Sequence, residues 1–250
     1  MDKFFWYTRG MKKESIMKQS QAKKRDNAMT NKILMGLIAL VLGLLFLEIL
    51  IVHSKNEQQK NASNQVQTAR IMANGDLLYH DALYMSALQA DGSYDFTENF
   101  TYVKPWLQQA DLVLGDFEGT INPDYPLSGY PLFNAPQSVT AAIKDAGYDV
   151  MDLAHNHILD SGLEGAFTTA DAFKKVGIDP IGVYEKPVRD KAPLLIKNVN
   201  GIKVAILSYA YGYNGLESNL TDKEVADHLS NLDEKRMKAE IQRAEKEADI

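Results

Sequence analysis

The sequence predicts an α/β domain with buried strands, preceded by a single membrane-spanning helix. From Thr68 onward, short apolar runs typical of strands alternate with longer amphipathic segments typical of helices. This alternation indicates a mainly parallel sheet. Before that point, residues 33–52 form an apolar run that only Glu48 interrupts. The chain has 250 residues, of which 45% are hydrophobic and 24% charged, as in globular proteins rather than disordered ones.

The apolar run at 33–52 is long enough, as a helix, to cross a hydrocarbon core of roughly 30 Å. Lysine and arginine are concentrated in residues 1–32, whereas only Lys55 and Lys60 follow closely. Because basic flanks stay on the cytoplasmic side, we expect a single-pass cell-membrane protein with a cytoplasmic tail at 1–32 and an extracellular domain. A cleaved signal peptide is the alternative, which we disfavour because the run exceeds the usual apolar core of about 7–15 residues.

Residues 53–67 are polar and rich in asparagine and glutamine, which predicts a flexible spacer before the domain at 68–250. Residues 1–54 carry a net charge of +5 and residues 55–250 carry −11. Nucleic-acid binding needs basic groups that neutralise phosphates, so this acidic domain argues against a nucleic-acid partner. The domain would also repel an anionic polymer unless a bound cation or a local basic patch intervened.

The first half of the domain is expected to consist of repeated strand–helix units. Each expected strand is a short apolar run, each expected helix has apolar residues at helical spacing, and Gly147 and Gly177 are expected to cap two of the helices. The expected elements are a strand at 68–74, helices at 78–89 and 99–109, a strand at 111–115, a helix at 137–146, a strand at 148–154 and a helix at 162–176.

The second half is expected to hold more strands and one long helix. Strands are expected at 178–183, 193–198 and 202–209, the last two joined as a hairpin by the turn Asn198-Val199-Asn200-Gly201. Residues 221–249 predict a helix with Thr221 as N-cap and Glu224 completing a capping box. The final Ala248-Asp249-Ile250 resembles the start of a further strand, as Ala110-Asp111-Leu112 does earlier in the chain.

Polar side chains follow three of the expected strands. They occur in Asn74-Gly75-Asp76, in Gly115-Asp116-Phe117-Glu118, and in His155-Asn156-His157 with Asp160 close behind. Ligands of open α/β sheets bind beyond the carboxyl ends of the strands, so these side chains predict an active or metal site. The chain has no cysteine, so a metal would be held by His, Asp, Glu or Asn.

Several spaced motifs together resemble the capsule-synthesis CapA family, whose members include PgsA-type proteins of poly-γ-glutamate synthesis. They are Gly75-Asp76, the run Ala110 to Thr120, Phe133-Asn134-Ala135-Pro136, and the run Gly147 to His157 with Asp160 and Gly162. The resemblance covers roughly residues 68–215. It implies a branch of the calcineurin-like metallophosphatases, with a four-layer α/β/β/α core and a site for one or two divalent metal ions such as Mn²⁺, Mg²⁺ or Fe.

The resemblance also implies roles for individual residues. Asp76, Glu118 and Asn156 would bind metal, with Asp116 assisting where the family usually has Asn, and His157 would act on the leaving group. From the residues themselves, Asp160 is placed to orient His157 by accepting its second N–H. The alternatives are a turn aspartate at position 76, a solvated acidic turn at 116–118 and a polar strand-to-helix loop at 155–157. His155 stands where the family usually has Asn, and its role stays open.

Two observations bear on completeness and on substrate binding. Family members continue into strands that carry further histidines, so we expect this chain to be the front part of the family's domain.

Tyr209, Tyr211 and Tyr213 alternate along the sequence and would line a cleft or, more commonly, pack in a core or on a sheet face.

The expected function is therefore that of a membrane-anchored, extracytoplasmic protein of capsule or poly-γ-glutamate biosynthesis or export, with a phosphoesterase-type metal site. The alternatives are a non-catalytic accessory or scaffold subunit, or a degenerate truncated product. Expected partners are the lipid bilayer, other subunits of a polymer synthase or export complex, and an anionic polymer such as poly-γ-glutamate.

Overall fold

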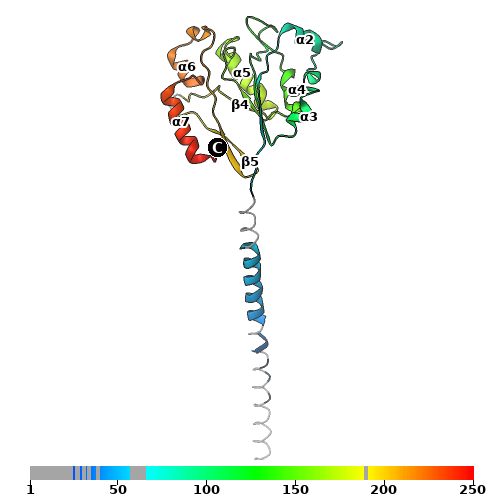
Figure 1. Cartoon of the computed structure of the whole chain (residues 1–250), viewed down its shortest axis with the longest axis vertical. Helices are drawn as coiled ribbons and strands as arrows, with labels where there is room; N and C mark the ends of the chain where they lie inside the picture. The colour runs from blue at the N-terminus through cyan, green and yellow to red at the C-terminus, as the bar shows by residue number, and fades with distance from the viewer. Residues whose placement is uncertain are drawn as a thin grey trace, which may run out of the picture. The chain divides into compact units, whose positions relative to one another are not determined.

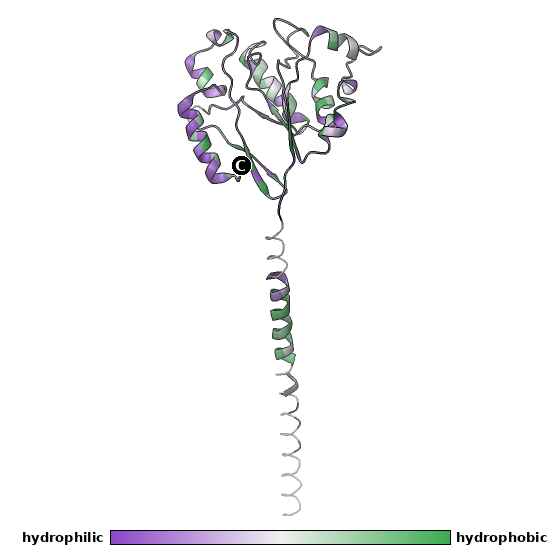
Figure 2. Cartoon of the chain, viewed as in Figure 1, coloured by the Kyte–Doolittle hydropathy of each residue, from purple (hydrophilic) through white to green (hydrophobic). Residues whose placement is uncertain are grey.

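The computed structural model describes residues 25, 29, 32, 35–37, 40–56, 66–188 and 191–250, and it divides into two units, 1–66 and 67–250. In the first unit, the helix Met35–Asn56 has 22 residues and a mean hydropathy of 2.8, so it is long and apolar enough to cross a membrane. In Figure 2, most of the described part of this helix is green, the colour of hydrophobic residues. The helix continues through residues 53–56, which the sequence assigns to the spacer, and residues 57–65 lie outside the described part.

The second unit is built on a parallel sheet of four strands. These are β1 (Ile71–Asp76), β2 (Leu112–Asp116), β3 (Val150–Asp152) and β4 (Asp179–Ile181). Their order is β1-β2-β3-β4, and every neighbouring pair is parallel. All four carboxyl ends therefore lie at the same edge of the sheet, as the alternation of strands and helices predicts.

The helices between these strands pack on one face of the sheet. They are α2 (Asp81–Ala87), the 3₁₀ helix η1 (Thr97–Phe100), α3 (Lys104–Leu107), α4 (Ser138–Ala146) and α5 (Gly162–Lys175). Their apolar faces join Val113, Met151 and Leu153 in the larger hydrophobic core. The expected helix at 99–109 is shorter than predicted and divided into η1 and α3. Gly147 caps α4 with φ 115°, a left-handed conformation that glycine adopts readily.

The other face of the parallel sheet is covered by a hairpin. Strands β5 (Leu195–Val199) and β6 (Ile202–Ile206) pair antiparallel, which confirms the predicted hairpin, although its second strand ends at Ile206 rather than at 209. A second hydrophobic core fills the space between the two sheets. It contains Leu112, Val150, Ile181, Val199 and Val204.

The C-terminal part begins with the 3₁₀ helix η2 (Leu216–Asn219) and continues with α6 (Asp222–His228) and α7 (Glu234–Glu247). The capping box of Thr221 and Glu224 is present, but the single helix predicted at 221–249 is wrong. Leu229 is extended, with ψ 151°, and 1% exposed. It forms a bridge with Val183, and Asn231 forms another with Ala210, so tertiary contacts outweigh the helix-forming composition.

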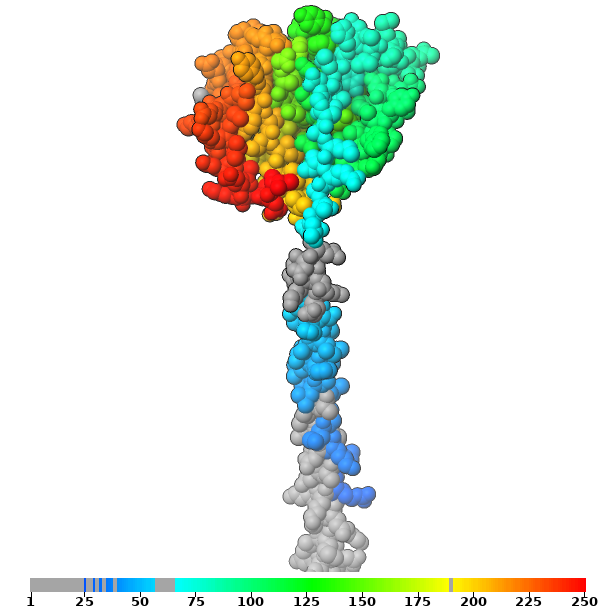
Figure 3. All heavy atoms as spheres, in the orientation of Figure 1, coloured from blue at the N-terminus to red at the C-terminus, as the bar shows by residue number. Residues whose placement is uncertain are grey.

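These elements form four layers in the order helices, parallel sheet, hairpin and α7 (Figure 1). This arrangement confirms the predicted α/β/β/α domain. In the space-filling view, α7 (red) lies against the orange and yellow segments that precede it (Figure 3). The main chain of the last two residues bonds to β6. Ile250 N–H donates to Lys203 O (3.2 Å) and Ile250 O accepts from Ala205 N–H (2.8 Å), as in a parallel ladder.

Candidate metal and phosphoester site

Three aspartates lie in register at the carboxyl ends of adjacent strands. Asp76 of β1 pairs with Asp116 of β2, which pairs with Asp152 of β3. In β1 the register shifts between Ala73 and Asp76, so Asp76 takes the place opposite Asp116 that Gly75 would otherwise have. Residues in register share a face of the sheet, so this shift brings the Asp76 carboxylate to the side of Asp116. Together with Glu118, these three residues are named the carboxylate cluster.

The carboxylate cluster is electrostatically unfavourable without a cation. Burial, followed by the charges of Asp152, Asp76 and Glu118, raises the pKa of Asp116 from 3.8 to about 7. Burial and then a hydrogen bond with the Asp76 carboxyl raise the pKa of Glu118. Asp116 Oδ1 is buried and has no hydrogen-bond partner within the described residues. A bound cation would relieve both the repulsion and the unpaired oxygen.

Asn156, His157 and Asp160 lie on the turn between β3 and α5. His157 Nδ1 lies 2.8 Å from Asp160 Oδ2, and His157 Nε2 lies 4.0 Å from Glu118 Oε1. Asp160 also accepts the backbone N–H of Phe133 at 2.6 Å, and the Phe133 ring contacts the imidazole edge-on, with ring centroids 4.8 Å apart. The imidazole is thus held from one side by a buried carboxylate, with its other ring nitrogen toward the carboxylate cluster.

His155 is buried, and its Nε2 has no hydrogen-bond partner within the described residues. It is 7% exposed, and its Nδ1 accepts the backbone N–H of His157 at 3.1 Å. Burial and the neighbouring His157 lower the pKa of His155 to about 3, so its imidazole is neutral. Because Nδ1 is an acceptor, the proton lies on Nε2. This contact joins the His155 ring to the backbone of His157.

The donor set suits a hard divalent cation, because it consists of carboxylate, amide and imidazole groups. The unpaired Asp116 oxygen is the structural feature that fits such an ion. In the part of the chain that the structure describes, no group of three or more His, Asp or Glu side chains is spaced to hold a metal ion.

Asp152 and Ser208 are two site residues that sequence reasoning missed. Ser208, just beyond β6, donates its hydroxyl to Asp152 Oδ1, which also accepts the Ala154 N–H at 2.8 Å. Burial raises the pKa of Asp152, although these hydrogen bonds oppose the shift. The available signal was the position of Asp152 at the end of its strand, the same position that drew attention to Asp116. Ser208 had no comparable signal because the strand it follows, β6, belongs to the other sheet.

A cavity of about 540 Å³ adjoins Asn156. Residues 154–156 form one wall and residues 209–215 form another, together with Glu217. The three alternating tyrosines do not share a face. Tyr213 is 1% exposed and Tyr211 is 97% exposed. The Tyr209 hydroxyl donates a hydrogen bond to Glu240 Oε2 at 2.6 Å. The strand that would have aligned them ends at Ile206. All three nevertheless line this cavity.

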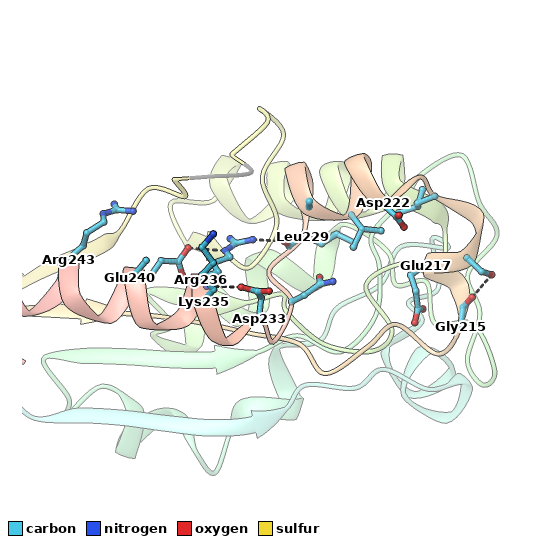
Figure 4. A pocket seen from close by; sticks show the side chains of 15 residues that line it. Gly215, Glu217, Asp222, Leu229, Asp233, Lys235, Arg236, Glu240 and Arg243 are labelled. Atoms are coloured by element: carbon cyan, nitrogen blue, oxygen red, sulfur yellow. Dashed lines mark hydrogen bonds and ion pairs between the residues drawn. The ribbon is translucent and has the colours of Figure 1, made fainter.

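A larger cavity of about 820 Å³ is lined by η2, α6 and α7 and contains none of the predicted site residues (Figure 4). Among the charged side chains that line it, one ion pair is present within the described residues, that of Arg236 with Glu240. Arg236 Nε donates to Glu240 Oε1 at 2.9 Å, and Arg236 Nη1 donates to Leu229 O at 3.0 Å. These contacts give Arg236 a structural role, while Arg236 Nη2, Arg243 Nε and Glu217 Oε2 are buried without a hydrogen-bond partner within the described residues.

The layers and the polar groups at the strand ends define the class of protein: an α/β/β/α domain of metallophosphatase type. Residues 70–250 match the family described as bacterial capsule synthesis protein PGA_cap. Since the match covers most of the chain, the protein belongs to this family.

Individual relatives agree with this assignment. The chain is 33% identical over 115 residues to "Capsule biosynthesis protein CapA" of Bacillus anthracis, covering 44% of this chain and 28% of the relative. It is 26% identical over 204 residues to "PGA biosynthesis protein CapA" of Bacillus subtilis (strain 168), covering 80% of this chain and 52% of the relative. An uncharacterized protein of Sinorhizobium fredii, y4uA, is 28% identical over 160 residues, covering 61% and 32%. The matched part is thus about half or less of each relative.

Proposed function

We propose that this protein is a membrane-anchored, extracytoplasmic component of capsule polymer biosynthesis or export, and that its domain hydrolyses a phosphoester with the help of divalent metal. The polymer we propose is poly-γ-glutamate, since one relative is named for PGA biosynthesis. The observation that carries the proposal is the placement of His157 Nε2 4.0 Å from Glu118, beside three in-register aspartates, in a capsule-synthesis family.

The anchoring part of the proposal rests on the helix Met35–Asn56 and on the charges around it. The nine basic residues of 1–54 all lie before the apolar run begins at residue 33, and residues 55–250 carry a net negative charge. This distribution favours a cytoplasmic N-terminus and an external domain. A location outside the membrane would place the domain where a secreted polymer emerges. Other subunits of a synthase or export complex are its proposed partners.

Each residue of the site has a distinct task in this proposal. Asp76, Asp116, Glu118 and Asn156 would hold metal, which when bound supplies charge stabilisation and an activated water. His157 would take up a proton at Nε2 from solvent and donate it to the leaving oxygen, and Asp160 would stabilise the positive imidazole that exists between these two steps. Burial of Asp160 behind Phe133 excludes water from this pair, which strengthens their interaction.

Metal binding and hydrolysis can be measured on the full chain in detergent micelles. After treatment with EDTA, Mn²⁺ is added and its binding is followed by calorimetry, while hydrolysis of bis(p-nitrophenyl) phosphate reports activity. We expect saturable binding and metal-dependent hydrolysis, with binding weakened in Asp76→Asn and hydrolysis lost in His157→Gln. The matched control His53→Gln lies in the apolar helix and should change neither. Hydrolysis that survives in His157→Gln would contradict the assigned role.

A second candidate is a non-catalytic accessory subunit that supports a membrane synthase complex. It is favoured by the absence, in the described residues, of three His, Asp or Glu side chains at metal-binding spacing. In that case the wild-type chain would bind no Mn²⁺, and the Asp76→Asn and His157→Gln variants would still restore polymer production in cells that lack the protein. Loss of polymer in both variants would instead support the enzymatic role.

A further inference from the structure

One polar side chain of the segment Tyr209–Gly215, that of Asn214, contacts both Asn156 and His157. The sequence did not predict this contact. Asn214 lines the cavity beside Asn156. Its Oδ1 accepts from Asn156 Nδ2 at 3.3 Å, and its Nδ2 lies 3.4 Å from His157 Nε2. Asn214 thus contacts both residues of the pair from the side opposite Asp160.

The directions of these hydrogen bonds follow from the groups involved. Asp160 is a carboxylate that accepts from His157 Nδ1–H, so the neutral imidazole has its lone pair on Nε2. Only a donor can face that lone pair, which makes Asn214 Nδ2 the donor and leaves Asn214 Oδ1 as the acceptor for Asn156 Nδ2–H. Asn156 Oδ1 receives no hydrogen bond within the described residues and is left free.

The backbone holds Asn214 in place. Its φ is +55° and that of Gly215 is +84°, so two successive residues are left-handed. Asparagine tolerates this conformation better than most residues. The preceding Tyr213 is fully buried, its hydroxyl donates to Asn231 Oδ1 at 2.7 Å, and its carbonyl accepts from Leu216 N–H at 2.9 Å. The turn is therefore fixed on both sides of Asn214, and its side chain is aimed by the packing of the segment.

We propose that Asn214 is a positioning residue, which holds His157 with its proton on Nδ1 and turns the Asn156 amide so that Oδ1 is free to bind metal. The metal part of this inference rests on the proposed function, whereas the orientation of His157 does not. Outer contacts of this kind commonly change metal affinity or activity by 10- to 100-fold when removed. Because the contacts of Asn214 are long, we expect an effect near the lower end, about tenfold.

The test uses Asn214→Gly in the full chain, in detergent micelles. Glycine adopts φ +55° without strain, so the variant removes the side chain while the turn keeps its conformation. Asn200→Gly is the matched control: Asn200 has φ 53° in the β5–β6 turn and no contact with the site. Near-UV circular dichroism checks that both variants are folded.

The main measurement is nitrogen-15 NMR of labelled histidine, with the His157 signal assigned from its loss in His157→Gln. We expect Nδ1 protonated and Nε2 unprotonated in the wild type and in Asn200→Gly, and a larger share of the Nε2–H form in Asn214→Gly. Calorimetry should show the Mn²⁺ dissociation constant raised about tenfold in Asn214→Gly alone. An unchanged His157 signal in Asn214→Gly, or an Nε2–H form in the wild type, would overturn the inference.

The two proposals fail in different ways. If the wild type binds no Mn²⁺, the metal site of the proposed function is refuted, along with the part of this inference that concerns Asn156. The nitrogen-15 signal of His157 still tests whether Asn214 holds the His157 proton on Nδ1. If the wild type binds Mn²⁺ and Asn214→Gly leaves both affinity and signal unchanged, the role of Asn214 is refuted while the proposed function stands.

Discussion

Replacing Asp116 by asparagine removes one charge from the carboxylate cluster and keeps the shape of the side chain. Its folded-state pKa of about 7, compared with 3.8 for the ordinary carboxyl, means that the charged form is disfavoured by the fold. The family to which the resemblance pointed usually has an asparagine at this position. We therefore expect Asp116→Asn to stabilise the metal-free protein and to weaken its binding of divalent metal.

The size of the effect follows from the pKa. The rise from 3.8 to about 7 corresponds to about 4 kcal/mol at 1.36 kcal/mol per unit. Since the Asp116 side chain is only partly buried, solvent screening reduces this figure to about 2 kcal/mol. Because the folded pKa is the higher one, the cost is absent below pH ~4 and complete only above pH ~7. The gain in Asp116→Asn should therefore grow as the pH rises between these values.

Thermal unfolding of the full chain in detergent with EDTA, followed by near-UV circular dichroism, measures this gain. At pH 8 we expect a midpoint about 4–8 °C above that of the wild type, and at pH 5 less than half of that difference. Asp124→Asn is the matched control, since Asp124 is exposed and its side chain forms no hydrogen bond or ion pair within the described residues. A variant no more stable than the wild type at pH 8, or an equal gain at both pH values, would refute the electrostatic reasoning.

Four further substitutions, one of them a control, test packing and helix capping in the domain. Gly182→Ala should lower the free energy of unfolding in urea by about 3 kcal/mol, because φ is +99° and the new Cβ would lie 2.6 Å from Ala154 N. Gly92→Ala, at φ +86° with nothing within 4 Å, should lose only about 1 kcal/mol, and an equal loss at both positions would contradict the steric argument. Thr221→Ala removes the capping box of α6 and should cost about 1 kcal/mol, measured as faster amide exchange in that helix; unchanged exchange would count against it. Phe173→Ala empties a buried position 5.1 Å from the Phe117 ring and should cost about 4 kcal/mol in urea, so a loss below about 1 kcal/mol would show that this core is not tightly packed.

Most of the fold could be predicted because its determinants are local. The apolar run at 111–115 overlaps β2, the run at 148–154 contains β3, and Gly147 ends α4 where expected. The long C-terminal helix was wrong because Leu229 and its neighbours bond to distant segments, a contact that composition does not reveal. Propensity alone favours a helix there, and the tertiary bridges decide otherwise.

The site was predictable where its residues follow strands and not where they approach from elsewhere. Asp76, Asp116 and Glu118 stand at strand ends in the sequence, and His157 and Asp160 are three residues apart. Their metal-binding and catalytic roles stay predictions. Ser208 and Asn214, by contrast, reach the site from the hairpin side of the domain, 56 and 57 residues further along the chain than their partners Asp152 and His157. The β1 register shift that turns Asp76 toward Asp116 is equally invisible without the pairing partner.

In the parallel sheet, each strand pairs with the strand that precedes it in the chain. A nascent chain can therefore add the strands one by one, and no strand must wait for a later one to fill a gap between neighbours. The carboxylate cluster comes together in the same order, while the segment that carries Asn214 arrives only after β6. In this order of assembly, the carboxylate cluster is exposed to dissolved cations before the segment that carries Asn214 packs beside it.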